Sequence, residues 1–457
     1  MLEQATVRRI RALVQQIEPA AVTYRRDFHR YPEAGWTEFR TASLVARRLT
    51  ELGYRVDVGQ TVIRDTERMG LPSSEALEAH WQRARAQGAD TEFLPALAGG
   101  FTGVVGTLAA GAGPTVALRF DLDALEIAEA SDRDHRPARE GFTSVNEGVM
   151  HACGHDAHAA IGLGIAEVLG WLRDEVRGTV RLIFQPAEEG VRGARSMVAA
   201  GVCDDVDFLL GLHVMSGWRL GEVSCGMGGY AATRKFDATF KGVPSHAGAN
   251  PQCGHNALIA AATAVLNLYA IARHGDGATR INVGKLDAGA SRNVIPAEAR
   301  LAAEVRGASS ELCEYMYAEA CRILEAAAAM QGCELATVDM GAAQSAISDE
   351  ALARRVERVA TELGDIACCL ATQAGGSEDV TYMMQRVQQH GGLAAVVGIG
   401  ADFFNIGCRD SVDREKVLRA HTERFDLDER ALGTAIALLS AAALDLMTDG
   451  ADASDRA

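Results

Sequence analysis

Two short segments concentrate side chains that can bind a metal ion or move a proton. Residues 151–158 read HACGHDAH, which places three histidines, a cysteine and an aspartate within eight positions. Residues 184–190 read FQPAEEG and contain the adjacent glutamates Glu188 and Glu189. Imidazole, thiolate and carboxylate groups together suit zinc or a neighbouring first-row divalent ion. The residue types and their spacing therefore predict a metal centre.

The paired glutamates have a chemical use at such a centre. One carboxylate can bind the ion while its neighbour accepts a proton from metal-bound water, because the cation lowers the pKa of that water toward about 7. Each piece alone has an ordinary explanation, since a Glu-Glu pair is usually a solvated turn and a lone histidine usually binds nothing. The sequence has no G-x-S-x-G elbow, no Walker A loop and no G-x-G-x-x-G after a strand. Metal-assisted chemistry is therefore favoured.

The convergence of three predicted strands favours a site over coincidence. Apolar runs at 115–120, 178–184 and 206–212 predict strands. The groups that follow these runs are Asp121 and Asp123, then Glu188 and Glu189, then His213. A helix predicted from about residue 157 separates the first two strands, so the sheet should be mostly parallel. Sites in open α/β sheets form outside the carboxyl ends of strands, and we expect these groups to meet there.

The chain of 457 residues is longer than a single core usually supports, and its pattern changes near residue 226. From 226 to 341 the predicted order is strand, helix, strand, strand, helix, strand, which is typical of a ferredoxin-like unit. We therefore expect an α/β catalytic domain, made by 1–225 and 342–457, that is interrupted by an inserted α+β lid at 226–341. Residues 61–100 are polar and irregular and predict a partly helical insertion.

Composition narrows the class of protein. Lys and Arg number 45 against 61 Asp and Glu, and the net charge of −16 argues against general binding to nucleic acid or to an anionic membrane. The apolar runs are interrupted and too short for a confident membrane span, and the N-terminus has no apolar signal segment. The ten cysteines form no C-x-x-C pair, as expected of reduced thiols. We predict a cytoplasmic protein that acts on small molecules.

Eight segments, in order over nearly the whole chain, resemble the M20 metallopeptidase family in its amidohydrolase branch. They are RRDFHRYPEAGWTEFRT (25–41), RFDLDAL (119–125), HACGHDAH (151–158), FQPAEEG (184–190), GLHV (211–214), GVPSHAGANP (242–251), SRNVIPAEA (291–299) and GGSEDVTYMM (375–384). Three more resemble the enzymes of this branch that cleave p-aminobenzoyl-glutamate: RMGLPSS (68–74), EGFTSVNEGVMHACGHDAHAAIGLG (140–164) and RVQQHGG (386–392). Together these motifs are highly specific.

The resemblance implies a hydrolase domain that holds two divalent metal ions, manganese or zinc. The implied ligands are Cys153 as the bridge, His155 and His213 at one ion, and Glu189 with a C-terminal histidine at the other. For this last ligand His421 fits the family's H-x-x-x-F pattern, and His390 is a weaker candidate. Residues 401–420 look like an insertion beside His421, and its effect on this ligand stays open. Glu188 would act as the general base and later as the acid.

Further roles are implied for residues around the ligands. His246, reaching from the lid of a partner protomer, would stabilise the oxyanion of the tetrahedral intermediate. The residues implied to orient the ligands are Asp123, His151 and Asp156. Asn293 and Arg306 would contact the substrate carboxylate, which a guanidinium fork matches at two points. The residues implied to line the acyl side of the pocket are Gly375, Gly376 and Ser377.

The implied reaction is hydrolysis of the amide bond of an N-acyl amino acid, most specifically of p-aminobenzoyl-glutamate to p-aminobenzoate and glutamate. One alternative is a broader N-acyl-amino-acid or hippurate-type amidohydrolase. Another is a non-catalytic, metal-binding partner subunit of a hetero-oligomeric hydrolase, against which the intact ligand set and Glu188 argue. The resemblance also implies a homodimer joined through the lid, whose sheet can extend edge to edge, or pairing with a paralogous second subunit.

Overall fold

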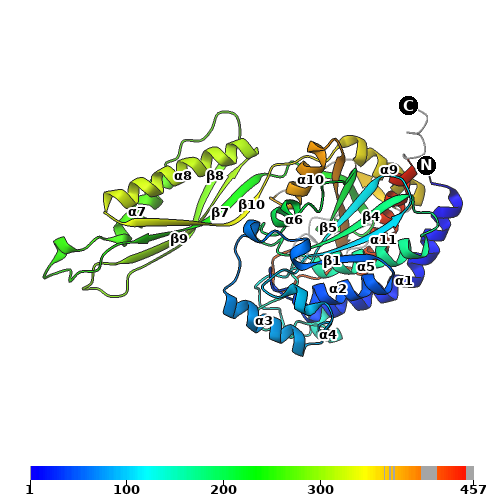
Figure 1. The fold of residues 1–457 in the computed structure, drawn as a ribbon, viewed down its shortest axis with the longest axis horizontal. Coiled ribbons are helices and arrows are strands. Elements are labelled where there is room, and N and C mark those ends of the chain that lie inside the picture. The colour runs from blue at the N-terminus through cyan, green and yellow to red at the C-terminus, as the bar shows by residue number, and fades with distance from the viewer. Residues whose placement is uncertain (1, 365, 370–371, 374–375, 403–418, 449–457) are drawn as a thin grey trace.

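The computed structural model describes residues 2–364, 366–369, 372–373, 376–402 and 419–448 of the chain. Within these residues two separate sheets form, one of nine strands and one of four. Figure 1 shows the four-stranded unit standing to one side of the larger unit, joined to it through β7 (Ala232–Lys241) and β10 (Glu334–Ala343). Each unit has its own hydrophobic core. The domain boundaries at 226 and 341 stay a prediction, which these two cores support.

The nine-stranded sheet has a parallel centre. Its strand order is β1-β2-β4-β3-β5-β13-β6-β11, and β12 pairs with β6 beside this path. The strands are β1 (Arg55–Val58), β2 (Val104–Ala110), β3 (Thr115–Asp121), β4 (Gly178–Gln185), β5 (Phe208–Arg219), β6 (Glu222–Gly228), β11 (Ala367–Cys369), β12 (Thr372–Gln373) and β13 (Leu393–Asp402). Strands β4, β3, β5 and β13 run parallel, whereas β2 and β6 are antiparallel to β4 and β13 at either side. The predicted α/β fold with a mostly parallel sheet is confirmed.

Helices cover both faces of this sheet. α5 (His155–Trp171) packs on β3 and against α1 (Gln4–Arg30) and α11 (Arg430–Leu446). α10 (Val380–Gln389) packs on β13 and β5 beside α6 (Ala194–Ala199), and Figure 1 shows this pair on the opposite side from α5 and α1. Further helices of this unit are α2 (Phe39–Glu51), α4 (Arg136–Glu140) and α9 (Glu350–Leu363). Because α5 begins directly after HACG, its packing determines where that motif lies.

The four-stranded unit has the predicted ferredoxin-like order. Its strands pair antiparallel in the order β10-β7-β9-β8, with β8 (Thr279–Ala288) at one edge and β9 (Glu298–Gly307) inside. Two helices, α7 (Ala257–Leu268) and α8 (Ser310–Met330), pack together on this sheet. The elements follow along the chain as strand, helix, strand, strand, helix, strand, so the α+β fold expected of the lid is confirmed.

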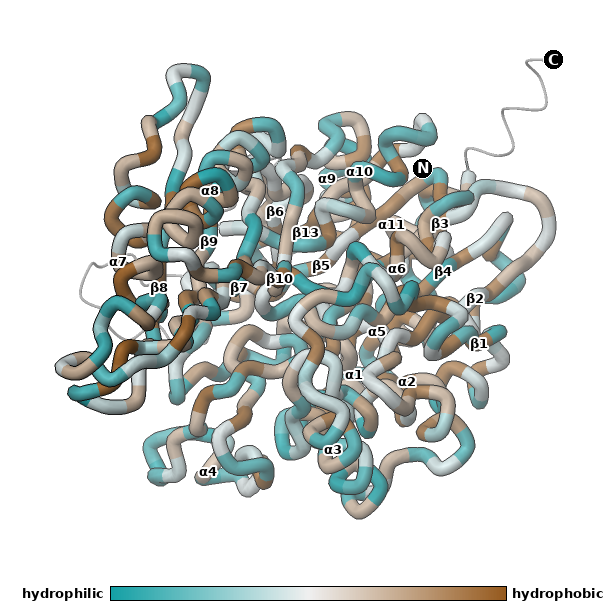
Figure 2. Tube along the Cα trace, turned by 60° about the vertical axis from the view of Figure 1, so that its left-hand side comes forward, coloured by the Kyte–Doolittle hydropathy of each residue, from teal (hydrophilic) through white to brown (hydrophobic). Residues whose placement is uncertain are grey.

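Residues 61–100 are partly helical, as predicted. The segment contains α3 (Ser74–Ala86) and short 3-10 turns at Asp65–Glu67 and Leu94–Leu97. It is tied to the core by Trp36, whose Nε1 donates to the carbonyl oxygen of Met69 at 2.8 Å. Figure 2 colours much of α3 and α4 as hydrophilic, which fits their place at the periphery of the molecule.

The longer helices are amphipathic or buried in the core. α1 spans 27 residues, and its buried positions face α5 and α11. Among the residues that the structure describes, no helix combines the length and the apolar character needed to cross a membrane.

α5 approaches the sheet closely because it carries a glycine at the point of contact. A β-carbon on Gly162 would lie 2.6 Å from a ring carbon of Phe184 on β4 and 2.8 Å from a ring carbon of Phe120 on β3. Contacts this short require the rings to move in a core that is already close-packed. Gly162 therefore sets the distance between the start of α5 and the strand ends.

Substitution of this glycine tests the packing. Gly162→Ala should lower the free energy of unfolding by up to about 2 kcal/mol, because overpacking costs about 1–3 kcal/mol and the higher helix propensity of alanine offsets about 1 kcal/mol. Urea denaturation measures the difference. Gly170→Ala, in the same helix, is the matched control, since its β-carbon would meet only the carbonyl oxygen of Leu52 at 3.9 Å. Equal effects of the two substitutions would contradict this account of α5.

Candidate metal centre

The predicted ligands meet at the carboxyl ends of the central strands. Cys153 directly precedes the N-cap of α5, His155 is its first residue, Glu189 follows β4, and His213 lies on β5. Together with His421 they form two groups, in each of which the donor atoms lie within 4.8 Å of one another. One group joins Cys153, His155 and His213, and the other joins Cys153, Glu189 and His421. Cys153 belongs to both groups, which is the geometry that a bridging ligand needs.

The histidines on α5 and β5 present their Nε2 atoms to the centre. His155 Nδ1 lies 2.9 Å from the carbonyl oxygen of Asp123, and His213 Nδ1 lies 2.7 Å from the carbonyl oxygen of Val214. Each Nδ1 must donate to such an oxygen, so Nε2 is the nitrogen that can bind a metal ion when the ring is neutral. In the described part of the chain, neither Nε2 of His155 nor Oε1 of Glu189 has a hydrogen-bond partner, although both are buried. These unsatisfied atoms fit a bound cation.

Asp123 ties two ligand segments together. Its Oδ1 accepts a hydrogen bond from the backbone N–H of Glu188 at 3.1 Å and lies 3.3 Å from His155 Nδ1. Its Oδ2 accepts from the backbone N–H of Glu189 at 2.8 Å. The resemblance implies that Asp123 orients a ligand histidine, and the structure places it against one.

Burial and crowding shift the pKa values of the central groups. Burial, and then the neighbouring carboxylate of Glu378, raise the pKa of Glu188 well above its usual value. Burial raises the pKa of the Cys153 thiol to about 11. Burial alone would lower the pKa of His155, but the carboxylate of Asp121, the hydrogen bond to Asp123 and the contact with Cys153 together outweigh burial and raise that pKa well above its usual value. These groups therefore hold protons that a divalent ion would displace.

A second acidic cluster lies behind Glu188, and sequence reasoning did not identify it. Glu378 and Asp379 directly precede α10, and each offers an oxygen within 4.8 Å of a Glu188 oxygen. Arg119, buried on β3, holds both, with Nη2 at 2.9 Å from Glu378 Oε1 and 3.2 Å from Asp379 Oδ1. The available signal was Arg119 itself, because an arginine inside an apolar strand needs buried carboxylates as partners.

His158, the last histidine of HACGHDAH, already uses both ring nitrogens. Its Nδ1 lies 3.0 Å from Asp121 Oδ2, and its Nε2 accepts from the backbone N–H of Val214 at 3.1 Å. Burial, followed by the proximity of His213, lowers its pKa well below the usual value, so the ring is neutral. His158 also comes close to Asp121 and His155. Its hydrogen bonds nevertheless favour the two groups that share Cys153 as the metal sites.

The other residues expected to orient ligands make different contacts. Asp156 Oδ2 lies 2.8 Å from Nε of Arg25 and 2.8 Å from Nδ1 of His29. The ring nitrogens of buried His151 find no hydrogen-bond partner among the described residues, and burial lowers its pKa to about 3. Asp156 thus supports α1 through its contacts with Arg25 and His29. The orienting roles of Asp156 and His151 stay predictions.

His421 reaches the centre, although most of the suspected insertion before it lies outside the described residues. Its Nε2 is 3.5 Å from Glu189 Oε1, and its side chain is 54% exposed. Its φ of 63° lies in the left-handed region, which residues other than glycine rarely adopt. His390, the weaker candidate, follows α10 and places Nδ1 at 2.9 Å from the carbonyl oxygen of Asp204. The geometry therefore favours His421 as the C-terminal ligand.

The substrate residues predicted in the lid lie outside both donor groups in this chain. His246 is exposed, and its Nδ1 accepts from the backbone N–H groups of Gly248 and Ala249. Asn293 is also exposed, and Arg306 pairs with Glu304 of the same strand at 3.0 Å. In this chain His246 and Arg306 thus bond to groups of the lid itself.

The loop expected to line the acyl side runs along the junction of the two units. Ser377 Oγ donates to the carbonyl oxygen of Ala231 at 2.7 Å, and the carbonyl oxygen of Gly376 accepts from the backbone N–H of Ala231 at 3.3 Å. Ala231 directly precedes β7. Gly375, the third predicted residue of this loop, lies outside the described residues.

A cavity of about 630 Å³ opens beside Glu189 and His421, which is a usual size for a small-molecule site. α3 contributes His80 to its wall, and the four-stranded unit contributes Lys235 of β7. Arg192, shortly after the paired glutamates, is a second cation in the lining. The segment at 61–100 and the lid therefore both shape the space next to the candidate metal site.

Metal binding should release protons. Cys153, with a pKa of about 11, and His155, with its raised pKa, are protonated at neutral pH and must bind as thiolate and neutral imidazole, so affinity should fall as the pH is lowered. Calorimetry in two buffers of different ionisation enthalpy measures the protons released, and we expect more than one per chain. Cys153→Ala should reduce that number. Cys203→Ala, at a buried thiol outside the donor groups, is the control. Unchanged proton release in Cys153→Ala would argue against thiolate ligation.

Comparison with known proteins gives relatives that span the chain. One subunit of the p-aminobenzoyl-glutamate hydrolase of Escherichia coli is 45% identical over 435 residues, which cover 94% of this chain and 97% of the relative. The indole-3-acetyl-aspartic acid hydrolase of Enterobacter agglomerans is 46% identical with the same coverage.

Solved structures match the fold over nearly the same length. An aminobenzoyl-glutamate utilization protein from Klebsiella pneumoniae has a TM-score of 0.80 and 40% identity, covering 94% of this chain and 97% of that one. A dinuclear metal-binding peptidase of the M20 family from Bacillus subtilis has a TM-score of 0.63 and 25% identity, covering 95% and 99%. The sequence model of peptidase family M20/M25/M40 matches residues 117–445, the segment that carries every member of both donor groups. The chain belongs to peptidase family M20/M25/M40.

Proposed function

We propose that this protein is a metal-dependent amidohydrolase that cleaves the amide bond of an N-acyl amino acid, with p-aminobenzoyl-glutamate as its substrate. The observation that carries the proposal is the convergence of two donor groups on Cys153, with Glu188 beside them. Two similar relatives are named as hydrolases of p-aminobenzoyl-glutamate and of indole-3-acetyl-aspartic acid. Both names describe an aromatic acyl group joined to an acidic amino acid.

Two divalent ions, manganese or zinc, would be held by these donor groups. Cys153 would bridge the ions. The other ligands would be those that the resemblance implies, His155 and His213 at one ion and Glu189 and His421 at the other. Thiolate and imidazole suit zinc, whereas carboxylates permit manganese. The description of the Bacillus subtilis neighbour as dinuclear supports two ions. When bound, the ions would polarise the amide carbonyl and lower the pKa of the attacking water.

Glu188 would move the proton during the reaction. One of its oxygens lies within 4.8 Å of donor atoms of His155 and Glu189, and one lies within 4.8 Å of an oxygen of Glu378. Glu188 would take a proton from the attacking water and return it to the leaving nitrogen of the amino acid. The return step needs a carboxyl group that can hold a proton. Burial beside Glu378 supports this step, because it raises the pKa of Glu188.

The cavity beside the second donor group would accept the acidic amino acid. Lys235 and Arg192 line it, and a cation can pair there with a carboxylate of the substrate. Arg192 already donates to the carbonyl oxygens of Glu189 at 2.8 Å and Gly70 at 3.2 Å. Lys235 is therefore the residue that we assign to the carboxylate in this cavity.

The lid would complete the site across a dimer. His246 would reach the reacting carbonyl group in a partner protomer and stabilise the oxyanion, while Asn293 and Arg306 would contact a substrate carboxylate. The exposed side chain of His246, which belongs to no donor group among the described residues of its own chain, supports a contribution from a second copy. The residues proposed for the acyl side are Gly375, Gly376 and Ser377. The Escherichia coli relative is named as one subunit of a hydrolase, which supports pairing with a paralogous second subunit in place of the homodimer.

A broader N-acyl-amino-acid amidohydrolase is the second candidate function. The similar identities of 45% and 46% to two relatives with different named substrates favour it. A cytoplasmic location belongs to both candidates and is supported by the free thiols of the described cysteines, which suit a reducing compartment.

Removal of the base tests the chemistry. Glu188→Gln should lower kcat for p-aminobenzoyl-glutamate about a hundred- to ten-thousand-fold, the usual contribution of a general acid–base, while both metal ions stay bound. The rate is measured as the release of p-aminobenzoate, which chromatography detects. Enzyme loaded with manganese and enzyme loaded with zinc are tested separately. Glu18→Gln on α1 is the control. Full activity of Glu188→Gln would refute the assignment, and an inactive wild type with two bound ions would point to another substrate or a missing second subunit.

Removal of the positive charge of Lys235 tests the substrate class. Lys235→Met should raise KM for p-aminobenzoyl-glutamate about ten- to hundredfold, as expected for loss of a hydrogen bond between charged groups. The KM for p-aminobenzoyl-alanine, which lacks the side-chain carboxylate, should rise much less. Lys241→Met, at the exposed end of the same strand, is the matched control. Equal losses on both substrates would show that Lys235 does not select the acidic side chain.

A further inference from the structure

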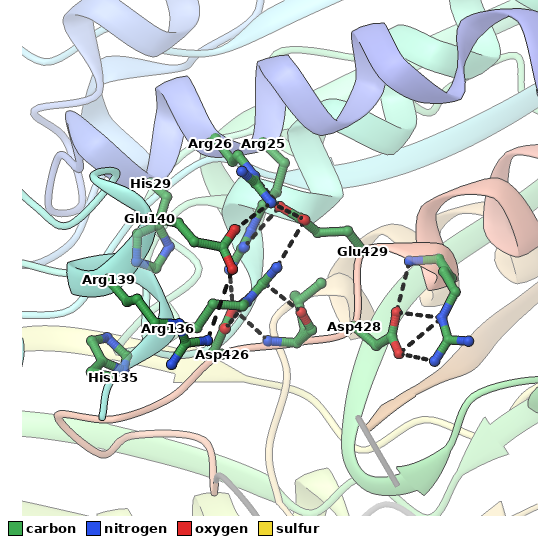
Figure 3. Close-up of polar contacts among 12 residues, drawn as sticks. Arg25, Arg26, His29, His135, Arg136, Arg139, Glu140, Asp426, Asp428 and Glu429 are labelled. Carbon is green, nitrogen blue, oxygen red and sulfur yellow. Dashed lines mark hydrogen bonds and ion pairs between the residues drawn. The ribbon is translucent and has the colours of Figure 1, made fainter. Parts of the chain in front are cut away.

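A buried ionic network lies between α1 and the segment that follows His421 (Figure 3). At its centre is Arg25 of α1, whose side chain is fully buried. Its Nε lies 2.8 Å from Asp156 Oδ2, and its Nη2 lies 2.9 Å from Asp426 Oδ1. Its Nη1 lies 3.3 Å from Glu429 Oε1. One guanidinium group thus contacts three carboxylates.

The two nearest carboxylates belong to different ligand segments. Asp156 directly follows His155 in the first turn of α5. Asp426 lies in the same short segment as His421, between that residue and α11. Arg25 therefore joins the segment that carries the first donor group to the segment that carries the last ligand of the second group.

Each carboxylate also has a second cationic partner. These partners are Arg136 for Asp426, Arg26 for Glu429 and His29 for Asp156. Arg136 reaches both oxygens of Asp426, at 2.6 and 2.8 Å. Figure 3 shows Arg25, Arg26 and Arg136 gathered around Asp426 and Glu429. Each segment thus has local partners of its own, and Arg25 supplies the direct ionic link between Asp156 and Asp426.

Stability alone is a poor explanation for such a network. Buried ion pairs add little net stability, because desolvation offsets their attraction, but they demand one geometry. The planar guanidinium fork is well suited to that demand, since it directs its hydrogen bonds along fixed lines. The geometry specified here is the separation of Asp156 from Asp426.

His421 is the ligand that needs such support. His155 is fully buried, and its Nδ1 bonds to the carbonyl oxygen of Asp123. His421 has a side chain that is 54% exposed and a backbone held at a φ of 63°. Its backbone N–H donates to the carbonyl oxygen of Ala152 at 2.7 Å. Its place at the centre therefore depends on how its segment lies against the HACG loop.

We propose that Arg25 is a positioning residue for the second metal site. By holding Asp156 and Asp426 on one guanidinium group, it sets the distance between the segment of Cys153 and the segment of His421. The inference rests on the two-metal centre of the proposed function and assigns a role to the arginine that opens the RRDFHR sequence. The site of Cys153, His155 and His213 should keep its geometry without this link, because its ligands lie on β5 and at the start of α5, which packs on β3 and against α1 and α11.

A metal titration of Arg25→Lys beside the wild type tests the proposal. Lysine keeps the charge and the helix, but one ammonium group cannot hold both aspartates as a fork does. We expect the variant to bind the first Zn²⁺ as the wild type does and the second about ten- to hundredfold more weakly, the range for residues that orient metal ligands. Arg26→Lys is the matched control, because Arg26 belongs to the same network but contacts Glu429 and Glu140 instead of the two aspartates. It should leave both binding steps unchanged.

Calorimetry with Zn²⁺ resolves the two steps, and thermal unfolding of the metal-free proteins reports any general loss of structure. Equal weakening of both steps, or no change in either, would overturn the role of Arg25. A wild type that binds a single ion would instead refute the two-metal centre. If Arg25→Lys does not fold, Asp426→Ala replaces it, since it removes the oxygen that accepts from Arg25 Nη2. Asp426→Ala should weaken the second step alone, and an unchanged second step would overturn the proposal.

Discussion

Buried charge at the carboxyl edge of the central sheet is the constraint on which the rest of the structure depends. Carboxylates there are removed from water, which is costly unless cations or hydrogen-bond donors compensate for it. The two backbone N–H groups after β4 satisfy Asp123, and Arg119 pairs with Glu378 and Asp379. The buried Nε2 of His155 and Oε1 of Glu189 have no hydrogen-bond partner among the described residues. Divalent ions held by the donor groups would supply positive charge at these atoms.

This constraint explains how the elements are used. The parallel strands β3 and β4 end at this edge and deliver aspartates and glutamates to it, and His213 reaches it from within β5, which continues to Arg219. α5 and α10 begin at that edge, with Asp156 in the first turn of one helix and Asp379 at the N-cap of the other. A helix N-terminus carries partial positive charge, so both helices favour the anionic groups around them. Packing and electrostatics therefore place the same elements.

Different elements hold the ligands of the two candidate metal sites. Other elements line the cavity proposed for the substrate. The ligands of one site lie on a packed helix and a central strand, whereas His421 lies in an irregular segment held by ion pairs to α1 and α4. Part of the cavity wall comes from α3 and from Lys235 of the lid, neither of which provides a ligand. A metal centre of one kind can thus serve different acyl amino acids when the surrounding segments change. The different names of two equally similar relatives fit this separation.

The sequence by itself determined the features that depend on residues close together in the chain. HACGHDAH and FQPAEEG carry their ligands in short segments beside buried strands, so spacing and strand periodicity were enough to predict a metal centre at one sheet edge. The order of the lid was predictable for the same reason, because each element has its own hydrophobic period. Only the tertiary structure decided that Arg119 meets Glu378 across 259 residues, that Arg25 meets Asp426 across 401, and that Lys235 faces the cavity. No local pattern records such contacts, because they exist only once the sheet has assembled and buried charges must find their partners.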